Sequence, residues 1–339
     1  LSRIGGEGAD SYFDHTLGNG KNYLALNDIE REMMTNVKKL KDAGKIGKII
    51  VLINTSNALQ VDFLKNNEFG VDATLWIGGT GQTGLEAVAE ILNGTVNPSG
   101  GLADTYCFDN YAHPVMQNFT PIQYGGDLTK IPGHADTYMI YQEGIYVGYK
   151  YFETRYEDYV LGQGNAGNFA YDDVVAFPFG YGLSYSKFDY SNIRINDLGN
   201  YNIEVSVDVT NTGNMKAKET VLLFVNKEVD NVYRSVTELK GFEKVELDVN
   251  EAKTVTIKLN KRSFALFDIN SKEFVVEKGN YEISFNKNAH DKIISEVISL
   301  DGKVLPSLRN NTPSYYDLNS FSPMDLEYLL NEKVQMTLY

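Results

Sequence analysis

Two short apolar runs, KIIVLIN at Lys48–Asn54 and ATLWI at Ala73–Ile77, constrain the fold of the first part of this chain. An uninterrupted apolar run of this length predicts a strand that is buried on both faces. Such strands belong to parallel sheets that helices cover. We therefore expect the two runs to be buried strands of a parallel sheet.

Helical patterns lie between and around these strands. Asn27 or Asp28 is placed to cap a helix that runs to about Ala43. Shorter helices are expected at Leu59–Asn66 and Leu85–Leu92. The alternation of helix and strand predicts an α/β fold. The apolar face of the first helix is expected to consist of Ile29, Met33, Val37 and Leu40.

The pattern changes twice further along the chain. From about Gly94 to Tyr185 it is rich in Gly, Pro, Asn, Asp and Tyr and has few periodic runs, with Tyr141–Glu153 as its most ordered part. After that, apolar residues alternate with polar ones, as they do from Ile203 to Val209. Short strands of this kind predict a β-sandwich of immunoglobulin or fibronectin type III kind. We expect an α/β domain at 1–186, an all-β sandwich at 187–300, and a linker or lead-in to another domain at 301–339.

The stretch GGTGQTGLEAVAEIL contains several glycines, and Gly79, Gly81 and Gly84 among them have the spacing of a dinucleotide-binding loop. A nucleotide site would also need a second strand that ends in Asp or Glu about 20 residues later, and the sequence lacks one. The lysine of a phosphate-binding loop is missing as well. The loop is better interpreted as a strand-to-helix turn that needs positive φ angles and close backbone packing.

Composition excludes several classes of partner. The formal net charge is −14, and nucleic-acid binding needs clustered Lys and Arg, so we expect no nucleic-acid partner. No apolar run approaches the ~20 residues that span a bilayer. Cys107 is the single cysteine and is expected to be buried in a core. We expect no metal and no organic cofactor, because metal-ligand spacing is absent among His15, His113, His134 and His290.

Several segments resemble glycoside hydrolase family 3 when they are taken in order. These are RIGGEGAD, WIGGTGQTGLEAVAEILNGTVNPSGGL, YQEGIYVGYKYFE, FPFGYGLSYSKF, VDVTNTGN and ELKGFEKVEL, which together reach from residue 1 to about 300. The resemblance implies an incomplete α/β sandwich domain followed by a fibronectin type III-like domain. It also implies a retaining exo-acting β-glycosidase, most often a β-glucosidase that removes terminal glucose and can take part in cellulose degradation. The glycine loop then corresponds to a turn of the α/β domain.

Two carboxylates perform retaining hydrolysis, one as nucleophile and one as acid/base. The resemblance implies that Glu7, in the Gly-Glu-Gly motif, is the general acid/base, and that flanking glycines let its loop approach a sugar. Glu143 is the rival carboxylate and is interpreted as a hydrogen-bonding residue beside the site. Asp10 is a candidate to orient the Glu7 loop, and Tyr12, Tyr146 and Tyr149 are candidates for the substrate rim.

The nucleophile of the family is an aspartate of a barrel domain, within a Ser-Asp-Trp-like motif that this sequence lacks. We therefore expect the chain to be a fragment that needs a barrel domain or a second chain, and to be inactive alone. The segment TPSYYDLNSFSPMDLEYLLNEKV resembles the lead-in to a barrel in members with reversed domain order. The expected substrate is a small β-glucoside or cello-oligosaccharide, the expected location is cytoplasmic with secretion as the alternative, and an oligomer is possible.

Two alternatives stay open at this point. One is another specificity within the same family, such as β-xylosidase. The other is a carbohydrate-binding module without catalytic activity, which would present a flat aromatic strip on the sandwich. The sandwich region contains aromatic residues, but most of them stand at alternating positions that are typical of a core: Tyr201, Phe224, Tyr233, Phe242 and Tyr281.

Overall fold

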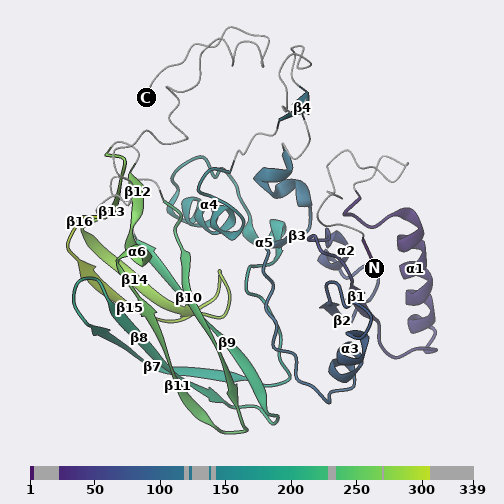
Figure 1. Ribbon diagram of the computed structural model, residues 1–339. Coiled ribbons are helices and arrows are strands. Elements are labelled where there is room, and N and C mark those ends of the chain that lie inside the picture. The colour runs from purple at the N-terminus through teal and green to yellow at the C-terminus, as the bar shows by residue number, and fades with distance from the viewer. Residues whose placement is uncertain are drawn as a thin grey trace.

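The computed structural model describes residues 1–3, 23–117, 122–123, 137–138, 143–227, 234–268 and 271–305. An α/β part lies beside a β-sandwich, with helix α4 (Tyr149–Leu161) between them (Figure 1). None of the described helices is both long enough and apolar enough to cross a membrane.

A small parallel sheet forms the centre of the α/β part. Strand β1 pairs with β2 in parallel, with Ile50 opposite Ala73 and Ile53 opposite Trp76. Val51 and Ile53 are buried against helices, whereas Ile50 and Trp76 are 46% and 41% exposed. The predicted burial of both faces is therefore wrong for the part of the sheet that the structure describes. The elements of this part are α1 (Asp28–Asp42), β1 (Ile50–Ile53), α2 (Asp62–Lys65), β2 (Ala73–Trp76) and α3 (Leu85–Leu92).

Helix α1 begins where the sequence predicts, but it contacts the domain through a different face. Its inward side carries Met34 and three charged residues, each of which forms an ion pair with the body of the domain. Three of the four residues of the predicted apolar face point outward, since Ile29, Met33 and Leu40 are 79%, 49% and 43% exposed, whereas Val37 is half-buried. Helical spacing therefore identified the stripe only in part, and the inward side also forms ion pairs with distant segments. The three pairs are Arg3–Glu30, Arg31–Asp62 and Lys41–Asp72.

The segment of low periodicity contains more regular structure than expected. Helix α4 runs through its Tyr-rich part and ends at Gly162, which has φ of 65°. Strand β3 pairs antiparallel with β6, and Cys107 of β3 is fully buried, as predicted. Burial raises the pKa of the Cys107 thiol to about 12, with Asp109 adding to the rise. The remaining elements are β3 (Tyr106–Cys107), two 3-10 turns (Asn110–Ala112 and Pro114–Gln117), β4 (Ile122–Gln123), β5 (Thr137–Tyr138), α5 (Tyr171–Val174) and β6 (Val175–Phe177).

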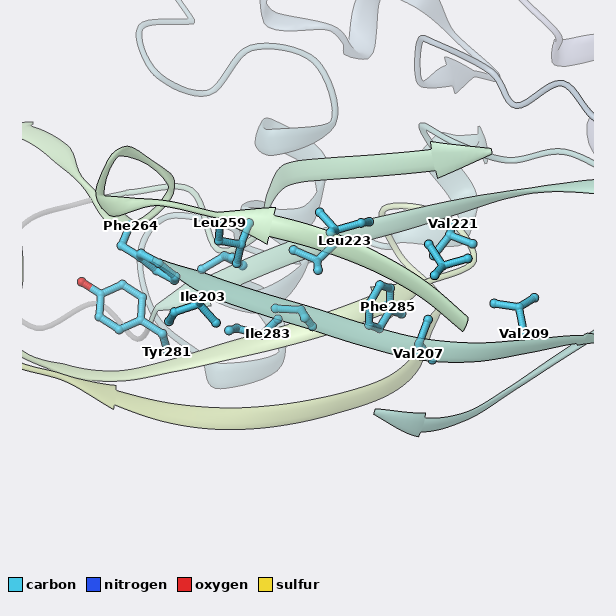
Figure 2. Close-up of a cluster of buried hydrophobic side chains, with 14 of the residues drawn as sticks. Ile203, Val207, Val209, Val221, Leu223, Leu259, Phe264, Tyr281, Ile283 and Phe285 are labelled. Atoms are coloured by element: carbon cyan, nitrogen blue, oxygen red, sulfur yellow. The ribbon is translucent and has the colours of Figure 1, made fainter. Parts of the chain in front are cut away.

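The second part of the chain is a β-sandwich, as the alternating pattern predicted. A sheet in the order β10-β9-β14-β15 faces a sheet in the order β11-β8-β7, and β12-β13-β16 form a smaller third sheet. Every second residue of β8 is buried, from Ile203 to Val209 (Figure 2). The elements are β7 (Phe188–Asp197), β8 (Ile203–Asn211), β9 (Ala217–Lys227), β10 (Glu238–Leu247), β11 (Ala252–Leu259), α6 (Lys261–Phe264), β12 (Leu266–Asp268), β13 (Glu273–Val276), β14 (Gly279–Asn286), β15 (Lys292–Leu300) and β16 (Lys303–Leu305).

The aromatic residues of the sandwich mostly fill cores. Tyr281 is fully buried and meets Phe264 edge to face at 5.5 Å in the core that Figure 2 shows. Phe224 is fully buried too. Phe242 is 67% exposed, while Tyr233 lies outside the described residues. The described aromatic residues therefore do not form the strip that a carbohydrate-binding module would present.

Strand β9 joins the sandwich to the α/β part, because both of its faces are buried. Val221, Leu223 and Val225 point into the sandwich core. Leu222 and Phe224 point the other way and pack with Tyr149, Phe179, Leu239 and Ala289. The ring of Tyr149 stacks on Phe179 at 4.8 Å, and its hydroxyl accepts a hydrogen bond from the backbone N–H of Leu239 at 2.9 Å.

Gly180, in the FPFGYGLSY segment, lies at this joint and needs to be glycine for two reasons. Its φ is +84°, and a Cβ there would lie 2.8 Å from Leu222 Cδ1 and 3.3 Å from the Asn288 backbone. Gly94 has a nearly identical φ of +82° with open space around it. The two positions share the backbone strain and differ in the close contact.

We expect Gly180→Ala to lower the free energy of unfolding by about 2–3 kcal/mol, and Gly94→Ala by about 1 kcal/mol. The difference between them measures the steric contact at the joint. Urea denaturation of the two variants checks this expectation. Equal losses would mean that the joint relaxes to admit a methyl group.

Candidate active site

The residues that precede the Gly-Glu-Gly motif lie at a sheet edge. Ser2 pairs in parallel with Asn54, at the end of β1. The backbone N–H of Asn54 donates to Leu1 O at 2.8 Å, and that of Arg3 donates to Asn54 O at 3.1 Å. Residues 1–3 therefore run beside β1 in the same direction. Arg3 lies at the carboxyl end of β1, the edge where α/β sheets place their ligand sites, and Glu7 comes four positions later in the sequence.

The side chain of Arg3 links the two described ends of segment 4–22. Its guanidinium donates to Tyr23 O at 2.5 Å, to Ala25 O at 2.7 Å and to its neighbour Ser2 O at 2.7 Å. It also forms a bidentate pair with Glu30, with both N···O distances at 2.7 Å. The planar fork of arginine suits this combination, because it can serve several acceptors at fixed angles.

Glu30 belongs to the first turn of α1, so Arg3 also connects the segment to this helix. The Glu30 carboxylate accepts a hydrogen bond from the backbone N–H of Asn27 at 3.0 Å, and Asn27 Oδ1 accepts one from the Glu30 N–H at 2.8 Å. This reciprocal pair is a capping box. Burial acts to raise the pKa of Glu30, but the hydrogen bonds from Arg3 and Asn27 outweigh it and leave the pKa lowered. The asparagine cap was visible in the sequence, whereas the partner 27 residues away was not.

The glycine loop after β2 has the geometry of a turn. Gly78 and Gly81 have φ of 54° and 61°, as the sequence predicts for a strand-to-helix turn. Gly84 approaches the carbonyl oxygen of Thr80 so closely that a Cβ would collide with it. These two requirements explain Gly78, Gly81 and Gly84 without a ligand, whereas Gly79 has neither a positive φ nor a close contact.

The structure also describes Glu143, Tyr146 and Tyr149 of the predicted site. Glu143 and Tyr146 are half-buried and belong to one turn, in which the Tyr146 N–H donates to Glu143 O at 2.9 Å. Tyr149 follows at the start of α4 and directs its ring and hydroxyl toward the sandwich. Burial raises the pKa of the Tyr149 phenol. Its engagement with Phe179 and Leu239 gives it a structural role, and its place on a substrate rim stays a prediction.

Glu7, Asp10 and Tyr12 lie outside the described residues, and their roles stay predictions. Among the residues that the structure does describe, no group of three or more His, Cys, Asp and Glu side chains could hold a metal ion. The structure therefore describes the residues that flank the predicted acid/base in the sequence, with the Arg3–Glu30 pair beside the end of β1, and it describes the Glu143–Tyr149 segment separately.

A partial α/β sheet joined to a fibronectin-type sandwich defines a class of two-domain architecture, and comparison with known proteins identifies its family. The model of the glycosyl hydrolase family 3 C-terminal domain matches residues 2–149, and that of the fibronectin type III-like domain matches residues 219–289. The chain belongs to glycoside hydrolase family 3, of which it carries the C-terminal domain and the fibronectin type III-like domain. The resemblance that the motifs indicated is thereby confirmed.

Individual relatives agree with this family. The chain is 35% identical over 259 residues to thermostable beta-glucosidase B of Acetivibrio thermocellus. This alignment covers 76% of this chain and 30% of the relative. It is 30% identical over 296 residues to an exo-alpha-(1->6)-L-arabinopyranosidase of Bifidobacterium breve, covering 87% of this chain and 35% of the relative. The chain thus spans about a third of the length of these curated relatives.

A solved structure matches both parts at once. Beta-glucosidase 3B from Thermotoga neapolitana, in complex with alpha-D-glucose, superposes with a TM-score of 0.72 at 27% identity. The match covers 91% of this chain and 38% of that one. The α/β part and the sandwich therefore occur together in the fold of the family.

Proposed function

We propose that this chain is the acid/base-bearing portion of a retaining exo-β-glycosidase that acts on terminal β-glucosyl residues. The observation that carries the proposal is the course of residues 1–3, which run parallel to β1 and bring Arg3 to its carboxyl end. In the sequence, the Gly-Glu-Gly motif begins three positions after Arg3. The match to the family's C-terminal domain over residues 2–149 includes this motif.

The proposed chemistry needs a second carboxylate. An aspartate nucleophile of a barrel domain would attack the anomeric carbon while Glu7 protonates the leaving oxygen. Glu7 would then take a proton from the water that hydrolyses the glycosyl-enzyme. The barrel is the proposed partner of this chain, as a further part of the same protein or as a second chain. Small β-glucosides and cello-oligosaccharides are the proposed substrates.

Relatives support a second specificity as well. One relative is named an exo-alpha-(1->6)-L-arabinopyranosidase, and another a putative beta-xylosidase. An arabinopyranoside or a xyloside carries a pentose, whereas a β-glucoside carries glucose. Glucoside is the first proposal because several of the similar curated proteins and solved structures are named beta-glucosidases.

A substrate panel tests the proposal on the full-length protein that contains this chain. We expect nitrophenyl β-glucoside and cellobiose to be hydrolysed with higher kcat/KM than the matching β-xyloside and α-L-arabinopyranoside. Proton NMR during the first minutes should show β-glucose as the initial product, because a double displacement retains the configuration. Initial release of α-glucose, or hydrolysis of none of these substrates, would contradict the proposal.

A further inference from the structure

We propose that the joint between α4 and the sandwich contains a pH-sensitive clasp, in which protonated His290 binds the buried carboxylate of Glu153. His290 lies on the turn between β14 and β15, and Glu153 lies on α4. His290 Nδ1 is 2.8 Å from Glu153 Oε2, and the two residues are 137 positions apart in the sequence. This clasp is independent of the proposed hydrolase activity.

Glu153 needs a charged partner because it is removed from water. Its side chain is 6% exposed, and Oε1 accepts a hydrogen bond from the Tyr171 hydroxyl at 2.5 Å. A buried carboxylate is costly unless a compensating charge accompanies its hydrogen bonds. In the described part of the chain, His290 is the one basic side chain that forms an ion pair with Glu153. The imidazolium form of His290 is therefore the form that fits this joint best.

Hydrogen bonds within the turn that carries His290, and stacking of its ring, hold this residue in position to bind Glu153. Asn288 Oδ1 accepts from the backbone N–H groups of His290 at 2.9 Å and Asp291 at 2.8 Å. Asn288 Nδ2 donates to Asp291 Oδ2 at 2.8 Å, and Asn288 is fully buried. The imidazole stacks on the ring of Tyr171, with centroids 4.0 Å apart. Little rotational freedom has to be lost when the clasp closes.

The charges around the imidazole all favour its protonation. The hydrogen bond that His290 Nδ1 donates to Glu153 is the largest influence, and it raises the pKa of His290 against the opposing effect of burial. The nearby carboxylates Asp291 and Asp172 raise it further. The titratable groups that face His290 from the neighbouring elements and from its own turn are Glu153, Tyr156, Tyr171, Asp172 and Asp291.

The direction of the pH effect follows from this rise. A histidine whose pKa is higher in the docked state than in the free state binds a proton on docking. Its contribution is complete below the ordinary histidine pKa of ~6.5, and it is lost as the pH rises through the higher docked value. The clasp is therefore closed in mild acid and weakened in mild alkali.

Weakening the clasp should loosen the joint without separating the domains. Leu222 and Phe224 still pack on the α/β part, and the backbone N–H of Ala289 still donates to Phe179 O at 2.8 Å. The Val236 N–H donates to Thr154 Oγ1 at 3.1 Å, one position along α4 from Glu153. These two amides report on the joint directly.

Hydrogen exchange in the full-length protein tests the clasp. After correction for intrinsic exchange, we expect protection of the peptides that contain Val236 and Ala289 to fall at least ~3-fold between pH 6 and pH 8. Peptides of β8 serve as the internal reference and should change less. In His290→Gln an amide can still donate to Glu153 but cannot titrate, so the pH response should disappear while the protein stays folded.

His113 offers a matched control. Burial lowers its pKa, and its ring contacts Phe152 next to Glu153, at 4.9 Å between centroids. His113→Gln should therefore leave the pH response of the joint intact. A response that persists in His290→Gln, or joint peptides whose protection does not fall in the native protein, would overturn the clasp. An NMR titration that places the His290 pKa at or below ~6.5 would overturn it as well.

Discussion

Replacing Glu7 by glutamine is expected to lower kcat/KM for cellobiose by about 10³-fold, within the range that general acid catalysis usually contributes. The amide cannot protonate a glucose leaving group. A dinitrophenyl leaving group departs without protonation, so attack on dinitrophenyl β-glucoside should be affected by less than ~10-fold. Steady-state kinetics of the full-length protein with both substrates measures the two effects.

Glu143→Gln is the control for this experiment, since Glu143 also precedes a glycine and was the rival carboxylate. We expect it to change the rates with both substrates by similar factors. If the leaving-group dependence appears in Glu143→Gln and not in Glu7→Gln, the two roles are exchanged.

Replacing Arg3 by alanine is expected to lower the free energy of unfolding by about 3–5 kcal/mol, the usual loss when one partner of a buried ion pair is removed. The pair is well buried, with side chains 6% and 16% exposed for Arg3 and Glu30. The substitution would remove the bonds that Arg3 donates to the carbonyl groups of Tyr23 and Ala25 and to the Glu30 carboxylate, which would keep only its bond from the Asn27 N–H among those described. Urea denaturation at neutral pH measures the loss.

Two further variants separate charge from geometry. Arg3→Lys keeps the charge but not the fork, so we expect it to lie between the native protein and Arg3→Ala. Lys38→Ala removes an exposed pair on the same helix, with Lys38 and Asp42 38% and 59% exposed, and should cost less than ~0.5 kcal/mol. An Arg3→Ala loss as small as that of Lys38→Ala would show that the pair does not stabilise this part of the fold.

Helix α1 illustrates what local pattern can and cannot predict. Its asparagine cap and its bounds follow from short-range chemistry, and the structure agrees with both. The buried side contacts partners that are remote in sequence, such as Asp62 and Asp72, and spacing alone chose a stripe of which all residues but Val37 are exposed. The alternation in β8 was a better guide because a sandwich strand has one core to face.

Helix α4 was missed for a different reason. Its sequence, YKYFETRYEDYVL, has a stripe at helical spacing that includes Tyr149, Phe152 and Tyr156, but most of the stripe is tyrosine, which is only weakly apolar and is also common in strands. Gly148 and Gly162 flank it, and Gly162 takes the left-handed conformation that ends many helices. Glycine spacing was thus a usable signal where hydrophobic periodicity failed.

For the candidate site as well, local sequence pattern predicted one part and not the other. The acid/base assignment came from a motif and stays a prediction, and the structure describes the residues that flank the segment 4–22. The Arg3–Glu30 pair and the Glu153–His290 pair each join residues that are far apart in sequence, at separations of 27 and 137. Without an alignment or a structure, no local pattern relates such positions. The sequence therefore allowed a prediction of the catalytic residue, but it did not predict the long-range contacts that hold the fold around it.

The most direct test of the central claim is chemical rescue of Glu7→Ala by azide in the full-length protein. A retaining enzyme without its acid/base still forms the glycosyl-enzyme from dinitrophenyl β-glucoside, and azide needs no general base to attack it. We predict that turnover rises with azide concentration and that NMR identifies β-glucosyl azide as the product. The absence of rescue in Glu7→Ala, together with β-glucosyl azide formed by Glu143→Ala, would contradict the assignment of Glu7.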